Sequence, residues 1–83
     1  FVGMRHEEDA VNAAAADGFI TGRPAVTLTV SAPGFLNGLP ALLEATVNGY
    51  PVIMIGGSST RHVVDLEEGE YEGLDQMNYA KQF

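Results

Sequence analysis

Apolar positions recur every three or four residues in two segments of the chain, a spacing typical of helices packed on one side. In residues 7–20, three carboxylates open the segment and an alanine-rich run follows. Early carboxylates complement the helix dipole and alanine has the highest helix propensity, so this segment predicts a helix that Gly22 and Pro24 end. Residues 35–47 predict a second helix, and the Asn-Gly pair at 48–49 supplies its stop.

Pro40 lies inside the second predicted helix. A proline there removes a backbone hydrogen bond and clashes with the preceding turn. We therefore expect either a kink at Pro40 or a helix that starts later than Phe35.

Two short runs rich in β-branched residues, at 25–30 and 52–55, follow the predicted helices and are bounded by proline and glycine. They predict buried strands. Residues 1–4 could end a further strand, and residues 74–80 could form a short helix. The order β-α-β-α-β predicts an α/β fold, a three-layer parallel sheet with flanking helices.

Ligands of parallel α/β sheets sit outside the carboxyl ends of the strands. Here those ends are residues 5–7, 31–34 and 56–60, which we expect to share one edge of the sheet. The acidic stretch at 61–73 that follows is long for a loop in a compact domain, and such loops are usually functional or disordered.

Composition excludes several classes of function. The net charge of −7 disfavours nucleic acid as a partner, and the absence of cysteine removes disulfides and thiolate chemistry. No apolar run approaches the roughly 20 residues of a membrane span, so we expect no membrane association and a cytoplasmic location. With 83 residues, a first residue other than Met and no polar tail, we expect a fragment holding at most one domain.

Glu7 is the one candidate catalytic carboxylate, because it directly follows a predicted strand end and would face the crevice. Its alternative role is that of an ordinary first-turn residue. His6 starts no zinc motif, since Ala10 stands where a second histidine would be needed, and no metal ligand is predicted. Tyr71 and Glu72 are either an aromatic anchor beside a solvated charge or functional residues of the acidic loop.

The sequence leaves two interpretations for each of the remaining two loops. Residues 31–34 form either a plain strand-to-helix turn or a helix start whose N–H groups hold an anion or a polar ring edge. Residues 56–59 lack the lysine of a phosphate-binding loop. The residues alone therefore predict an α/β fragment with one candidate carboxylate and three loops at one edge.

Three longer stretches carry a resemblance to a known family: FVGMRHE at 1–7, TVSAPGFLNGL at 29–39 and LDQMN at 74–78. They strongly resemble oxalyl-CoA decarboxylases, which depend on thiamine diphosphate. The Arg-His-Glu start, the Pro-Gly-x-x-Asn loop and the Gly-Ser-Ser strand end are typical of thiamine-diphosphate enzymes in general. The segment around Tyr71, Glu72 and LDQMN is more particular to oxalyl-CoA decarboxylases.

The resemblance implies that residues 1–83 are part of the N-terminal domain that binds the cofactor's aminopyrimidine ring. Glu7 would then hydrogen-bond the ring nitrogen, best in a dry pocket that favours the neutral carboxyl group, and Pro33 and Asn37 would line the pyrimidine pocket. Tyr71 and Glu72 would approach the reacting end of the substrate as catalytic and substrate-binding residues, with Gln76 as a further substrate contact.

The implied enzyme is a carbon-carbon lyase that decarboxylates oxalyl-CoA to formyl-CoA and CO₂, with the cofactor supplying the difficult chemistry. The resemblance places the cofactor's diphosphate and its Mg²⁺ in a separate domain, so residues 1–83 alone are expected to be inactive. It also implies a homodimer or homotetramer of the full-length chain. Three positions depart from the family pattern, namely Glu8, Pro40 and Gly73.

Two alternatives accompany this hypothesis. A 2-hydroxyacyl-CoA lyase or an acetolactate-synthase-like carboligase would share the cofactor machinery and differ in its substrate loops. A non-catalytic interaction or structural module would instead use the unpaired sheet edges of a short chain for association.

Overall fold

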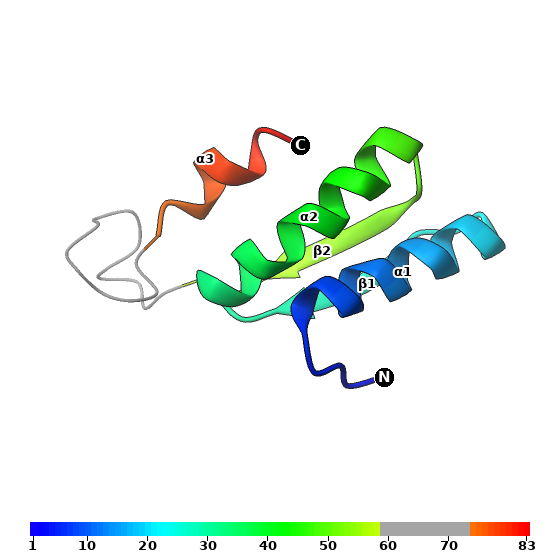
Figure 1. The fold of residues 1–83 in the computed structure, drawn as a ribbon, viewed down its shortest axis with the longest axis horizontal. Helices are drawn as coiled ribbons and strands as arrows, with labels where there is room; N and C mark the ends of the chain where they lie inside the picture. Colours follow the sequence, from blue (N-terminus) through cyan, green and yellow to red (C-terminus); the bar gives the residue numbers. More distant parts are fainter. Residues whose placement is uncertain (59–73) are drawn as a thin grey trace.

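The computed structural model describes residues 1–58 and 74–83, which form an α/β unit with a parallel sheet. Its strands pair in parallel, with Ala25 opposite Val52 and Thr29 opposite Gly56. The α/β class and the parallel pairing that the sequence predicts are confirmed. The elements in chain order are α1 (Glu7–Thr21), β1 (Ala25–Thr29), α2 (Pro33–Asn48), β2 (Val52–Gly56) and α3 (Gln76–Ala80) (Figure 1).

Helix α1 follows the sequence-based bounds closely because both of its ends are capped. The backbone N–H of Glu8 donates to Nδ1 of His6 over 3.1 Å, which satisfies one free donor of the first turn. At the other end Gly22 adopts φ 71°, a left-handed conformation that suits glycine, and its N–H donates to the carbonyl of Gly18.

Helix α2 begins earlier than expected, at Pro33, and runs without a break past Pro40. The expectation of a start later than Phe35 is therefore wrong. Pro33 is favourable at the first position of a helix, since its missing N–H would have no partner there. Gly49, at φ 71°, ends the helix.

Helices α1 and α2 pack against each other on one face of the sheet (Figure 1). Small side chains fill much of the space between these layers.

The opposite face of the sheet is exposed. Val26 and Leu28 are each 57% exposed there, and Ile53 and Ile55 nearly as much. Residues 1–58 and 74–83 thus supply two layers, and the further helical layer of the three-layer prediction is not among them. The buried apolar residues are Val11, Ala14, Ala15, Ala32, Phe35, Ala41 and Ala45.

Residues 1–4 form no strand, so the structure begins with α1 instead of the expected β-strand. A strand is held by paired backbone groups and by burial of alternate side chains. The side chains of Phe1 and Val2 remain in solvent, so burial does not hold this segment in place. Helix α3 starts two residues later than predicted, where the Asp75 side chain accepts from the N–H of Asn78.

Among the described residues, no helix has the length and apolar character that crossing a membrane requires.

Two glycines inside helices lie close to the segment that carries β2. A side chain at Gly18 would overlap the backbone carbonyl of Pro51, whereas one at Gly38 would meet the terminal methyl of Met54 at 2.7 Å. Backbone cannot move aside as the tip of a methionine can.

We therefore expect Gly18→Ala to destabilise the full-length protein by about 1–3 kcal/mol, as overpacking does, despite a helix-propensity gain of about 1 kcal/mol. Gly38→Ala is the matched control, because both glycines lie inside helices and only the first faces backbone. Thermal melting of the two variants checks this. A Gly38→Ala variant that melts at or below the temperature of Gly18→Ala would contradict it.

Candidate functional site

The N-terminal ends of α1 and α2 meet at the carboxyl edge of the sheet, and they bring Glu7 and Asn37 together. The side-chain amide of Asn37 donates to Oε2 of Glu7 over 3.2 Å, between residues 30 positions apart in the chain. Both residues had been predicted as cofactor-binding from the sequence. The structure places them in direct contact.

Gly34 lies against the same carboxylate and leaves its other oxygen uncovered. A Cβ at Gly34 would stand 3.3 Å from Oε1 of Glu7 and 2.5 Å from Cγ1 of Val30. Any side chain there would push against the strand end and the carboxylate. The glycine therefore keeps one oxygen of Glu7 accessible beside the turn.

The pKa of Glu7 lies below the ordinary value of a glutamate. The main cause is a hydrogen bond from its own backbone N–H, followed by the Asn37 amide and the nearby charge of His6, while burial acts in the opposite direction. The sequence-based expectation of a dry pocket that favours the neutral carboxyl group concerns the cofactor-bound site and stays a prediction. Glu7 is a half-buried hydrogen-bond acceptor in its ionised form.

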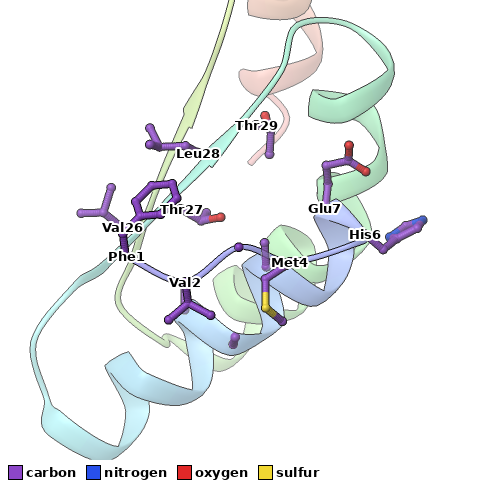
Figure 2. A pocket seen from close by; sticks show the side chains of 13 residues that line it. Phe1, Val2, Met4, His6, Glu7, Val26, Thr27, Leu28 and Thr29 are labelled. Atoms are coloured by element: carbon purple, nitrogen blue, oxygen red, sulfur yellow. The ribbon is translucent and has the colours of Figure 1, made fainter.

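Glu7 also lines a cavity of about 650 Å³ between residues 1–4, the first half of α1 and strand β1. Figure 2 shows Glu7 and His6 at one end of this cavity and Phe1 and Val26 at the other. The lining is largely apolar, and Glu7 and His6 carry the ionisable side chains within it. The wall that α1 and β1 form suits one side of a flat ligand that has an apolar body and a polar edge.

Thr29, at the end of β1, is a lining residue that sequence reasoning missed. Its hydroxyl oxygen is buried and has no hydrogen-bond partner among the described residues. Leaving a buried hydroxyl unpaired costs about 1–3 kcal/mol. Its position at the carboxyl end of a strand was the available signal in the sequence.

Pro33 and Gln76, two further predicted site residues, lie at the same edge. Pro33 is half-buried at the first position of α2. Gln76, expected as a substrate contact, uses its side-chain amide on this chain's own backbone: the N–H of Ala32 donates to its Oε1, and its Nε2 donates to the carbonyl of Gly57 over 2.8 Å.

Tyr71 and Glu72 lie outside the described residues, so their catalytic and substrate-binding roles stay predictions. His6 acts as the N-cap of α1, in agreement with a structural role. No cluster of three or more metal-ligating side chains occurs within residues 1–58 and 74–83.

The sequence of this chain is similar to one family model and to several known proteins. Residues 1–79 match the family model described as thiamine pyrophosphate enzyme, N-terminal TPP binding domain. The whole chain is 64% identical to oxalyl-CoA decarboxylase of Escherichia coli K12 and 43% identical to 2-hydroxyacyl-CoA lyase of Oryza sativa, covering 15% and 14% of those proteins. Human 2-hydroxyacyl-CoA lyase 1 is 45% identical over 98% of this chain and 14% of its own length. The chain thus spans about 15% of the length of the curated relatives it matches.

The contact between Asn37 and Glu7 can be tested by titration. Removing a donor destabilises the ionised carboxylate, so we expect Asn37→Ala to raise the pKa of Glu7 towards its ordinary value. The measurement is the side-chain carboxyl ¹³C shift of Glu7 against pH in the full-length, cofactor-free protein.

The matched control is Asn48→Ala, since the Asn48 amide donates to the backbone carbonyl of Glu44 and not to Glu7. An unchanged titration of Glu7 in the Asn37 variant would show that the amide does not act on the carboxylate.

Proposed function

This chain belongs to the thiamine pyrophosphate enzyme family, as part of the N-terminal TPP-binding domain, and we propose that its full-length protein decarboxylates oxalyl-CoA to formyl-CoA and CO₂ with thiamine diphosphate. The observation that carries the proposal is the ionised Glu7, held by Asn37 beside a largely apolar cavity. Identity of 64% to an oxalyl-CoA decarboxylase, against 43% and 45% to two 2-hydroxyacyl-CoA lyases, supports the choice of substrate.

The described residues fit the aminopyrimidine end of the cofactor in three respects. Glu7 offers a carboxylate acceptor for a ring nitrogen, and Gly34 leaves that carboxylate uncovered where a Cβ would crowd it. The buried hydroxyl of Thr29 has no hydrogen-bond partner within the described part of the chain, so it is available to a polar group of a ligand. The cavity walls provide apolar surface for the faces of a ring.

In this proposal the cofactor and the residues of the chain have separate roles at the site. When bound, thiamine diphosphate supplies the electron-accepting chemistry that loss of CO₂ requires. Glu7 holds a proton shared with the pyrimidine ring nitrogen, and Asn37 fixes the direction of the carboxylate. Pro33 starts α2 beside the pocket, and its fixed φ keeps that turn in place without needing a hydrogen-bond donor.

The rest of the proposal concerns groups beyond the described residues. Tyr71 and Glu72 would contact the reacting end of oxalyl-CoA. Mg²⁺ and the diphosphate would be bound by a separate part of the full-length protein, which we propose to be a cytoplasmic homodimer or homotetramer. The net charge of −7 leaves few cations here for coenzyme A, so its phosphates would also be bound elsewhere.

A 2-hydroxyacyl-CoA lyase is the second candidate, since relatives of that name match nearly the whole chain at 43% and 45% identity. It would share the use of Glu7 and would differ in its substrate loops and in the acyl-CoA that is cleaved. The substrate assay below separates the two.

We expect Glu7→Gln to lower formyl-CoA release from oxalyl-CoA by about 10²-fold or more, because the variant cannot hold the ring proton as a carboxylate can. The assay uses the full-length protein with thiamine diphosphate and Mg²⁺. Asp9→Asn is the matched control, since Asp9 is an exposed carboxylate in the same helical turn, and it should retain activity.

Equal activity of the Glu7 and Asp9 variants would overturn the role of Glu7. Native protein that cleaves a 2-hydroxyacyl-CoA and leaves oxalyl-CoA intact would move the assignment to the lyase.

A further inference from the structure

The ends of β1 and β2 are tied together by one side chain that comes from a distant part of the chain. Gln76 accepts from the N–H of Ala32 through Oε1 and donates to the carbonyl of Gly57 through Nε2. The first of these bonds joins residues 44 positions apart. Both polar atoms of the amide are thus bonded to backbone.

Ala32 has an uncommon backbone conformation, with φ 48° and ψ −96°. It is the only residue other than glycine with a positive φ in the described part of the chain. Side chains of L-residues disfavour this region, so surrounding contacts must hold it. Glycine has no such preference and adopts positive φ without steric cost.

Ala32 is also the residue from which α2 starts. Its carbonyl accepts from the N–H of Leu36 over 2.8 Å, the first hydrogen bond of the helix, and its side chain provides no cap. Ala32 is therefore bonded at both backbone groups: its N–H donates to Gln76, and its carbonyl accepts the first hydrogen bond of α2. The direction in which α2 leaves the sheet depends on both bonds.

That direction matters for Glu7. Gly34, two residues beyond Ala32, lies against its Oε1, and Asn37, one helical turn further on, donates to its Oε2. The Gly57 bond restrains the same region from the other side, because Gly57 donates to the carbonyl of Thr29 over 2.9 Å and lies close to the N–H of Ser31.

We propose that Gln76 is a positioning residue that holds Ala32 in its positive-φ conformation and so sets the first turns of α2, from which Asn37 orients Glu7. Its connection to cofactor binding rests on the proposed function. The effect on Glu7 itself depends only on the contacts described above. This role differs from the substrate contact expected of Gln76, because it acts through the backbone and the carboxylate.

The test uses Gln76→Met in the full-length protein, which keeps the length of the side chain and removes both hydrogen bonds. We expect the pKa of Glu7 to rise, as for loss of the Asn37 contact, and thiamine diphosphate to bind about two- to ten-fold more weakly, the range for one lost hydrogen bond. The KM for oxalyl-CoA should stay native. Gln82→Met is the matched control, since Gln82 is exposed and its amide reaches only the carbonyl of Asn78.

A second substitution separates positioning from other effects. Ala32→Gly accepts the positive φ without support, so adding it to Gln76→Met should return the pKa of Glu7 and the affinity for thiamine diphosphate towards native values. If Gln76→Met does not fold, Gln76→Asn replaces it, because its side chain is one methylene shorter and cannot reach both loops. The pKa of Glu7 and the affinity for thiamine diphosphate are then compared with and without Ala32→Gly.

Two results would overturn the proposal. One is a native pKa of Glu7 and native cofactor affinity in the Gln76 variants together with a raised KM, which would mark a substrate contact. The other is no recovery on adding Ala32→Gly. Failure of the proposed function would look different, because native protein would then not bind thiamine diphosphate or convert oxalyl-CoA, while the titration of Glu7 would still respond to Gln76.

Discussion

Close packing of α1 on α2 and on the turn before β2 is the constraint on which the rest of the structure depends. Alanines fill the helix interface, with Ala14 and Ala15 on one helix and Ala41 and Ala45 on the other all buried. Gly18 allows α1 to approach the backbone at Pro51 more closely than any side chain would permit. Larger residues would move the helices apart, and the carboxylate of one would no longer lie within reach of the amide of the other.

Much of the fold could be predicted from the sequence, because periodicity and terminal signals agree along most of the chain. Glycines at 22 and 49 end both long helices, as expected, and both strands lie where β-branched residues gather. The errors arose where local signals are weak or oppose one another. Pro40 suggested a late start for α2, but the favourable position of Pro33 and the packing of the first turn prevailed.

The site was predictable in part. Glu7 and Asn37 are separated by 30 positions, and only the resemblance to a family brought them together before the structure did. Neither the conformation of Ala32 nor the use of Gln76 has a local signal, since alanine has no preference for positive φ and glutamine is common on surfaces. The donors that lower the pKa of Glu7, its own backbone N–H and the Asn37 amide, also could not be read from the sequence.

The outer face of the sheet carries a consequence for anyone who handles this domain by itself. Val26, Leu28, Ile53 and Ile55 form an apolar strip across both strands, with about half of each side chain in contact with water. An apolar outer face on a parallel sheet is typical of sheets that are covered on both sides. Residues 1–83 by themselves would therefore be prone to self-association, and polar substitutions chosen to prevent it would remove the apolar surface of this sheet face.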